Sequence, residues 1–384
     1  MAMTMVKREI VCSDSQGFAA ALSKAMKAVA TSTSIPILTG IHIHAEGECI
    51  TITGSDDKTM VRIVQKSIGK AIGSDPVSFV VPGRLFTEII RKLPPGEMKL
   101  QIEENKVLIQ ASKSSFELKT MPVDEYPLRS SNPYTVSFEV EGSLFMKGLS
   151  SMYAASTNDM RPVLKAVCLS GAGNKLSFVS TDSHRLSQIH IVMDEEVDTF
   201  MNVLIPSTSA NEMIKLLKDE AGKVHVQCND GELRISVNGI TFSTRLIEGT
   251  FPDTKRIIPQ DFTLQFTLNR EELFGSLERV NIMAQESKNK TCFFHLVSSG
   301  TIPSLNINAM GEEVGKVKEQ VFIADFKGEE LKFAINAKYF VDALRNMSSK
   351  KITILGNGAT SPFIIRPVED DKDLALVLPV RMVS

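Results

Sequence analysis

Apolar and polar positions alternate along many short stretches of this chain. Alternation with a period of two predicts extended strands, because successive side chains of a strand point to opposite faces. It is clearest in four segments of the first third: 40–44, 49–53, 106–110 and 115–119. Other stretches predict helices, such as 16–29 and 144–155, and Pro82 and Pro206 suit the first turn of two further helices. One covered face per strand indicates antiparallel sheets packed against these helices.

The same order of elements returns along the chain at a nearly constant spacing. Ile35-Pro36-Ile37-Leu38 returns 126 residues later as Arg161-Pro162-Val163-Leu164, and Ser55-Asp56 returns at the same spacing as Thr181-Asp182. The helix that follows Val81-Pro82 returns 124 residues later, and a third copy begins a further 130 residues on. The agreement among these spacings predicts an internal repeat.

Three domains of about 125 residues each follow from this repeat. We place them at residues 1–128, 129–254 and 255–384, since Tyr126-Pro127 near the end of the first recurs as Phe251-Pro252 near the end of the second. Each domain is expected to hold two helices and about eight strands. The predicted fold class is therefore α+β, with six helices in the chain.

Composition bounds the class of protein. The chain has 384 residues, of which 43% are hydrophobic, and a net charge of −2, so it can build several cores and is not strongly basic in total. No stretch approaches 18 apolar residues and the first nine residues lack a signal-peptide core, so no membrane segment is expected. Five scattered cysteines without a Cys-x-x-Cys pair favour a reduced, cytosolic protein. They are Cys12, Cys49, Cys168, Cys228 and Cys292.

Charge is divided unevenly between the predicted helices and the rest of the chain. The six helical segments together carry a net charge of +5, which leaves −7 for all other residues. A surface built from these helices would attract phosphates. The chain has no set of aromatic side chains for base stacking and no helix with a cluster of base-reading side chains, so nucleic-acid binding would be independent of sequence. This modest bias fits an acidic small-molecule partner equally well.

Asp182, Ser183 and His184 are the three residue types of a catalytic triad, but their spacing argues against one. They are consecutive, and strand patterns over 175–180 and 186–191 flank them. On an extended chain Ser183 would point away from both neighbours, out of reach of a general base. We expect instead a turn that holds the wall of a binding site.

A metal site is the other chemical alternative. His42 and His44 share one face of a predicted strand, but no third ligand lies at a metal-binding spacing, so we expect surface strand residues. No cofactor is predicted. The sequence also lacks the glycine-rich phosphate loop of nucleotide-binding proteins, so a step that consumes ATP would need a separate protein.

Several motifs together resemble the beta subunit of bacterial DNA polymerase III, the family of sliding clamps. Thr181-Asp182-Ser183-His184-Arg185-Leu186 is similar to the Thr-Asp-(Gly/Ser)-His-Arg-Leu signature of that family, and Leu378-Pro379-Val380-Arg381-Met382 is similar to its C-terminal segment. These two motifs are the most specific. Further similar segments extend the resemblance over nearly the whole chain: 35–40, 81–86, 121–127, 161–164 and 249–253.

The resemblance implies a fold and a function. Three clamp-type domains per chain would join head to tail with a second copy, forming a homodimeric closed ring whose hole is lined by helices. The ring would encircle double-stranded DNA independently of sequence. It would tether DNA polymerase III and other DNA enzymes, which would attach through a short hydrophobic peptide motif. Such a protein is not an enzyme, acts in the cytoplasm at the nucleoid, and needs an ATP-dependent clamp loader.

The resemblance also assigns residues to three surfaces. A peptide-binding cleft is formed by Leu164, Thr181, His184, Arg185, Leu186, Pro252, Arg256, Ile257, Leu378, Pro379, Val380, Arg381 and Met382. The dimer interface is formed by Phe116, Leu118, Ile282 and Met283. Cations that would line the DNA channel are Lys24, Lys27, Arg84, Arg91, Lys147, Lys215, Lys338 and Arg345. In the cleft, apolar walls would bury a Leu or Phe anchor, while His184 and Arg185 would meet polar or acidic groups at the rim.

The sequence departs from the family pattern in places. The segment 30–34 contains no arginine, where many clamps carry a basic residue that faces DNA, and the first helix of the third domain is net acidic. A second reading therefore stays open. The chain could be a clamp-fold paralogue that acts as a peptide-binding or regulatory protein without encircling DNA.

Overall fold

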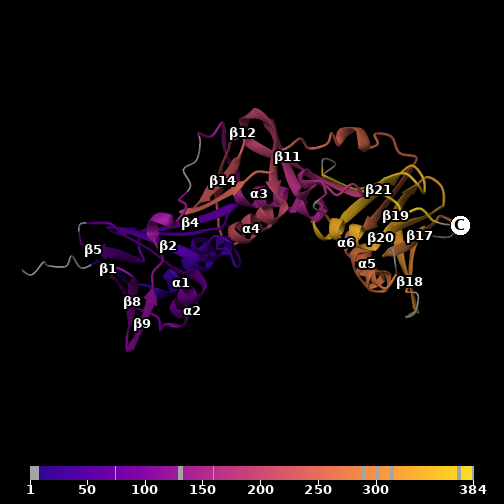
Figure 1. The fold of residues 1–384 in the computed structure, drawn as a ribbon. Coiled ribbons are helices and arrows are strands. Elements are labelled where there is room, and N and C mark those ends of the chain that lie inside the picture. Colours follow the sequence, from indigo (N-terminus) through magenta and orange to yellow (C-terminus); the bar gives the residue numbers. More distant parts are fainter. Residues whose placement is uncertain are drawn as a thin grey trace, which may run out of the picture. The chain divides into compact units, whose positions relative to one another are not determined.

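The computed structural model describes residues 8–73, 75–128, 133–158, 160–287, 290–299, 302–311, 315–369 and 373–382. Within them lie six α-helices and 23 β-strands, so the predicted α+β class and the predicted number of helices are confirmed. The strands form three sheets (Figure 1). The chain divides into two compact units, one of Met1–Ser143 with Glu212–Leu246 and the other of Leu144–Asn211 with Ile247–Ser384. The domain boundaries placed from the sequence stay a prediction.

The first unit contains two antiparallel sheets. A five-stranded sheet has the order β5 (Gly69–Ile72), β1 (Arg8–Cys12), β7 (Met98–Ile102), β8 (Lys106–Ala111) and β9 (Ser114–Lys119). An eight-stranded sheet has the order β10 (Val136–Glu141), β13 (Lys223–Cys228), β14 (Glu232–Val237), β15 (Ile240–Arg245), β4 (Thr59–Gln65), β3 (Cys49–Ser55), β2 (Gly40–Glu46) and β6 (Val77–Pro82). Strands from two successive copies of the repeat therefore share one sheet.

Two helices of the first unit, α1 (Ser15–Ala25) and α2 (Gly83–Lys92), lie beside each other (Figure 1). Helix α1 begins at Asp14, whose carboxylate accepts the backbone N–H groups of Gln16 and Gly17, each at 3.0 Å. Phe18 and Phe86 join the two helices by an edge-to-face contact with ring centroids 6.3 Å apart. The two helices pack on strands β2, β3, β4 and β6 of the eight-stranded sheet.

The second unit is built on a ten-stranded sheet. Its order is β11 (Ala166–Thr181), β12 (Arg185–Pro206), β23 (Leu374–Val377), β22 (Phe363–Pro367), β21 (Lys351–Gly356), β16 (Leu264–Asn269), β19 (Gly315–Lys327), β18 (Ser304–Gly311), β17 (Thr291–Val297) and β20 (Leu331–Asn336). Strand β23, from the C-terminal segment, pairs with β12 through Arg185 and Leu186. The C-terminal motif begins directly after β23, and Leu378 donates its backbone N–H to the His184 carbonyl (2.9 Å), so the two motifs that carry the family resemblance lie side by side.

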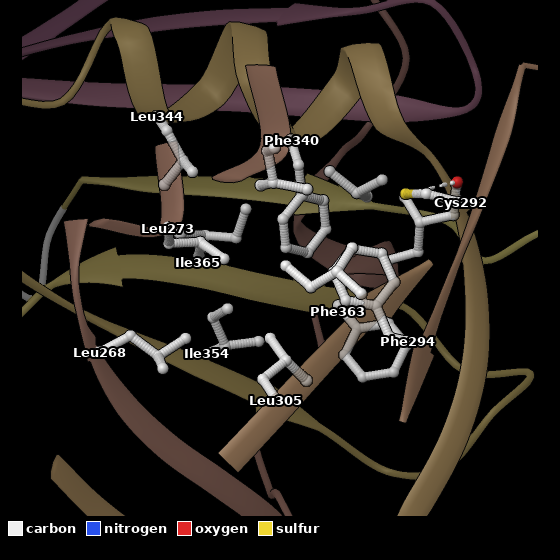
Figure 2. Close-up of a cluster of buried hydrophobic side chains, with 14 of the residues drawn as sticks. Leu268, Leu273, Cys292, Phe294, Leu305, Phe340, Leu344, Ile354, Phe363 and Ile365 are labelled. Atoms are coloured by element: carbon white, nitrogen blue, oxygen red, sulfur yellow. Dashed lines mark hydrogen bonds between the residues drawn. The ribbon is translucent and has the colours of Figure 1, made fainter. Parts of the chain in front are cut away.

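Helices α5 (Arg270–Gln285) and α6 (Ala337–Arg345) pack on each other and on this part of the sheet. Each begins at an asparagine, Asn269 or Asn336, whose side-chain oxygen accepts backbone N–H groups of the first turn. Figure 2 shows the apolar cluster below them, in which Phe294, Phe340 and Phe363 meet. Ala375 and Val377 of β23 belong to the same cluster, so this strand is packed against a dense apolar core.

The remaining two helices, α3 (Gly142–Leu149) and α4 (Ser207–Leu217), contribute residues to both units. Helix α4 begins directly after Pro206, as predicted. Helices α1 and α3 are shorter than the predicted 16–29 and 144–155. Each gives way to a 3₁₀ turn, Met26–Ala28 after α1 and Ser150–Ala154 after α3. A tighter final turn satisfies carbonyl groups that the α-helix leaves without partners.

The sequence repeat has a structural counterpart in each unit. Asp56 and Asp182 both form a turn by accepting the backbone N–H two residues ahead, at 2.7 Å from Lys58 and 2.9 Å from His184. Aromatic residues at corresponding positions of the two repeat copies each pack on an apolar cluster. Tyr126 packs on Ile37 and Leu38, and Phe251 packs on the cluster of Ala166, Cys168 and Leu204.

The cysteines behave as small apolar residues. All five are free, and all except Cys49 are buried. Burial raises the pKa of Cys12 to about 12 and that of Cys168 to about 11, so these thiols stay protonated and unreactive. Among the described helices none is long and apolar enough to cross a membrane.

Candidate binding surfaces

The segment that links β11 to β12 is a turn, as predicted from its spacing. One carboxylate oxygen of Asp182 accepts the backbone N–H groups of His184 (2.9 Å) and Arg185 (3.0 Å), and the Thr181 hydroxyl donates to the Arg185 carbonyl (2.6 Å). Ser183 sits at a positive φ of 77° at the tip. The carboxylate of Asp182 is thus committed to the turn and to Arg185, which leaves no triad geometry.

Arg185 is held by carboxylates from two elements. Its Nε donates to Asp182 Oδ2 (2.9 Å) and one terminal nitrogen donates to Asp342 Oδ2 on α6 (2.7 Å). The guanidinium also lies 4.7 Å from the ring centroid of Tyr339 and 5.9 Å from that of Tyr153. Its charge is therefore balanced within the chain. The expectation that Arg185 meets an acidic group of a partner stays a prediction.

A cavity of about 410 Å³ opens beside this turn. It is lined by His184, Asn336, Tyr339, Leu378, Pro379 and Val380. The C-terminal segment is fixed at its edge, because Leu378 donates its backbone N–H to the His184 carbonyl (2.9 Å) and Val380 donates to that of Ala334 (2.7 Å). The volume and the mixed apolar and polar lining are those of a small-ligand or peptide-anchor pocket.

The other predicted cleft residues fall into two groups. Leu164, Thr181 and Leu186 are buried and do not line the cavity. Leu186 belongs to an apolar cluster against which Leu378 and Ile258 pack, so it supports the wall. The second group is exposed and does not line this cavity: Pro252, Arg256, Ile257, Arg381 and Met382. The sequence did not assign Asn336 and Tyr339, which line it. The sequence feature that could have indicated these two residues is the start of α6, where the capping residue Asn336 is followed one turn later by Tyr339.

The predicted DNA-channel cations all lie on helices or on the 3₁₀ turn after α1. Six of the eight lie within ion-pair distance of a carboxylate. The pairs are Lys24 with Glu220, Arg84 with Glu88, Lys147 with Asp373, Lys215 with Glu212, Lys338 with Asp342 and Arg345 with Glu278. These partners offset much of the positive charge, so the helices attract phosphates less strongly than their lysines and arginines suggest.

The four predicted interface residues differ in exposure. Phe116 lies on β9, the edge strand of the five-stranded sheet, and is 39% exposed, whereas Leu118 of the same strand is buried. Ile282 on α5 is 68% exposed, and Met283 packs partly against the apolar core. An exposed Phe on an unpaired edge and an exposed Ile on a helix are features of docking surfaces. Their assignment stays a prediction.

His42 is a buried residue rather than the expected surface one. It is 3% exposed, its Nε2 lies 2.7 Å from the Ser78 hydroxyl, and its ring stacks on Tyr126. Burial lowers the pKa of His42 to about 4, with smaller contributions from His44 and Arg62. Tyr126, from the end of the first domain, packs over the strand at His42. The alternation of residues along the strand does not indicate this contact. The described residues hold no cluster of three or more His, Cys, Asp or Glu side chains at metal-binding distances.

Taken together, the fold and this site define a binding protein made of repeated α+β units, with a peptide-sized cavity beside its C-terminal strand. Family models for the DNA polymerase III beta subunit match three successive segments: the N-terminal domain over residues 10–130, the central domain over 143–253 and the C-terminal domain over 255–381. The chain belongs to the DNA polymerase III beta subunit family, the bacterial sliding clamps.

Individual relatives agree with the family assignment. The chain is 32% identical to the beta sliding clamp of Staphylococcus epidermidis over 94% of its own length and 96% of the relative's. It is also 32% identical to the beta sliding clamp of Bacillus subtilis, over 93% of its own length and 95% of the relative's. The crystal structure of the Bacillus subtilis clamp superposes with a TM-score of 0.92 at 29% identity, covering 98% of this chain and all of that one. The crystal structure of the beta subunit from Streptococcus pyogenes superposes with a TM-score of 0.90 at 26% identity, covering 97% of this chain and all of that one.

The family membership confirms the resemblance and the three clamp-type domains predicted from the repeat. It also confirms the function as that of a sliding clamp, the non-catalytic subunit of DNA polymerase III, in preference to the peptide-binding paralogue.

Proposed function

We propose that two copies of this chain close head to tail into a ring that encircles duplex DNA, with three domains from each copy. The observation that carries this proposal is the match of three consecutive clamp domains over residues 10–381. The internal ion pairs of the helix cations support it further, because weak phosphate contacts permit sliding, while ring closure rather than affinity retains the protein.

Retention on circular and linear DNA tests the encirclement. The ATP-dependent loader would open the ring and close it on a nicked circular plasmid, and the loaded protein should stay bound through gel filtration. Cutting the plasmid once should release it, because a ring slides off a free end. Equal retention before and after the cut would instead indicate contact binding, which is the behaviour of a paralogue that does not encircle DNA.

We further propose that the cavity beside Leu378 receives a hydrophobic anchor from a short peptide of the polymerase and of other DNA enzymes. Leu378, Pro379 and Val380 offer apolar surface at its edge, and His184 and Asn336 offer hydrogen-bonding groups. Exposed Met382 follows on the same segment. Leu378→Ala with Met382→Ala should weaken binding of a polymerase-derived peptide by tenfold or more, since deleted hot-spot side chains each cost about 1 kcal/mol or more.

A matched control is Leu85→Ala with Met201→Ala, which removes an exposed Leu and an exposed Met outside the cavity. This control should leave peptide affinity unchanged, and both variants should keep the dimeric mass of the parent. Loss of dimerisation in the Leu378/Met382 variant, or equal weakening by the control, would contradict a cavity that is separate from the subunit junction.

The remaining expectations belong to the same proposal. We place the junction at Phe116 and Leu118 of one copy and Ile282 and Met283 of the other, with domain boundaries near 128 and 254. The protein would act in the cytoplasm at the nucleoid. The family assignment supports these placements.

A further inference from the structure

One face of the eight-stranded sheet carries two polar rows where β4, β15, β14 and β13 lie side by side. In one row Arg62 of β4 pairs with Thr241 of β15, which pairs with Ser236 of β14. In the next row Met60 pairs with Ser243, which pairs with Arg234, which pairs with Gln227. All these side chains point away from the buried apolar face that includes Val61, Ile63 and Phe242. Two arginines therefore lie diagonally across β15 on one face.

These seven residues line a cavity of about 120 Å³. The lining contains two guanidinium groups, three hydroxyl groups and one side-chain amide, with Met60 as its one apolar member. Pockets that take whole drug-sized molecules measure about 300–1,000 Å³, so this cavity has room only for a small group and its water. All seven residues belong to the first unit, so the cavity is complete within it.

The charge in this cavity is not balanced. The side chain of Arg62 makes no hydrogen bond or ion pair with any residue that the structure describes, and its Nε is buried without a partner. Arg234 donates from Nε to the Ser243 hydroxyl (3.3 Å) and lies 3.6 Å from one carboxylate, that of Glu232. That carboxylate oxygen also accepts the hydroxyl of Tyr134 (2.8 Å). Arg234 therefore has a carboxylate within ion-pair distance, whereas the buried Nε donor of Arg62 is left unsatisfied.

We propose that this cavity binds a phosphate-type oxyanion. Guanidinium forks match the spacing of phosphate oxygens, and hydroxyl donors complete such sites. A tetrahedral anion has four oxygens that can accept hydrogen bonds from several sides. The lining requires this, because its donor side chains belong to Arg62, Arg234, Thr241, Ser243 and Gln227. A lone carboxylate has two oxygens and would leave some of these donors unsatisfied. The anion would lie against the guanidinium groups of Arg62 and Arg234 and offset the excess positive charge.

The test is phosphate binding by the full chain, measured by isothermal titration at constant ionic strength in chloride. Arg62→Gln with Arg234→Gln should lower the association constant at least tenfold. Arg245→Gln is the matched control, because Arg245 lies on the same sheet, is exposed, and pairs with Asp57 outside the cavity (3.9 Å). The control should bind as the parent does. Circular dichroism and thermal unfolding must show that the double variant is folded. If it is not, Arg62→Lys replaces it, with the same expected direction.

A second titration with O-phosphoserine separates two sources of the anion. Binding of both ligands supports the site and indicates that a phosphorylated side chain can enter it. Binding of inorganic phosphate alone supports the site as one for the free ion. Absence of phosphate binding by the folded parent would overturn the proposal, and so would binding that the double variant retains or that Arg245→Gln lowers equally.

Discussion

At the scale of single residues, His42 couples the stability of the first unit to pH. Its ring is buried against Tyr126, and burial lowers its pKa to about 4, below the ordinary value of 6.5. The unfolded chain therefore binds a proton at His42 more readily than the folded chain does. The stabilisation due to a neutral His42 is complete above pH 6.5 and is lost as the pH falls toward 4.

Replacing His42 with Gln, which cannot titrate, tests this linkage. Between pH 7 and pH 4 the parent should lose about 3 kcal/mol of unfolding free energy relative to His42→Gln, following the shift between the two pKa values. Urea unfolding at several pH values measures both proteins, and other titrating groups cancel in the difference. Parallel pH curves for the two proteins would show that His42 titrates normally in the folded chain.

At the scale of elements, Arg185 joins the β11–β12 turn to helix α6. The guanidinium binds Asp182 in the turn and Asp342 on the helix, and both carboxylates are largely shielded from water. Lys338 also reaches Asp342, at 2.8 Å. Because His184 on the turn and Asn336 and Tyr339 at the start of α6 line one cavity, this ion network fixes the relative position of its walls.

Asp342→Asn should therefore lower the unfolding free energy by about 1–3 kcal/mol, since it weakens charge-assisted hydrogen bonds to two cations in a shielded site. The comparison is Glu88→Gln, which removes a carboxylate from the exposed Arg84 pair and should cost less than about 1 kcal/mol. Urea unfolding measures both. Equal costs for the two variants would show that the network contributes no more than a surface pair.

The sequence predicted the elements better than the contacts between them. Helix starts at Pro82 and Pro206 and the turn at Asp182 follow from local chemistry, and the structure has all three. The partner of Arg185, by contrast, lies 157 residues away, and no local pattern relates Asp342 to it. The cavity is likewise formed by residues from three separate segments. The prediction that His42 is a surface residue was wrong for the same reason, because the residue that packs over it, Tyr126, comes from a separate segment.

At the scale of the whole molecule, the proposed ring depends on the junction. Phe116 is exposed on an edge strand and Ile282 is exposed on α5, so their removal should leave the folded chain intact. Phe116→Ala with Ile282→Ala should give folded monomers that still unfold cooperatively, at a temperature lowered by the lost stabilisation from the junction. These monomers should not be retained on circular DNA, because half a ring does not enclose it.

The matched control is Phe293→Ala with Ile257→Ala, since both residues are about as exposed as Phe116 and lie outside the proposed junction. It should stay dimeric and be retained on circular DNA. If the Phe116/Ile282 variant were to remain dimeric, the junction would lie elsewhere. If it gave monomers without native near-ultraviolet circular dichroism or a cooperative unfolding transition, these side chains would belong to the core of a single chain.

The mass of the protein in solution tests the ring most directly. Light scattering coupled to gel filtration, at micromolar concentration and physiological salt, should give about twice the 42.2 kDa of one chain. A single species at the mass of one chain, unchanged on raising the concentration, would contradict the two-chain ring.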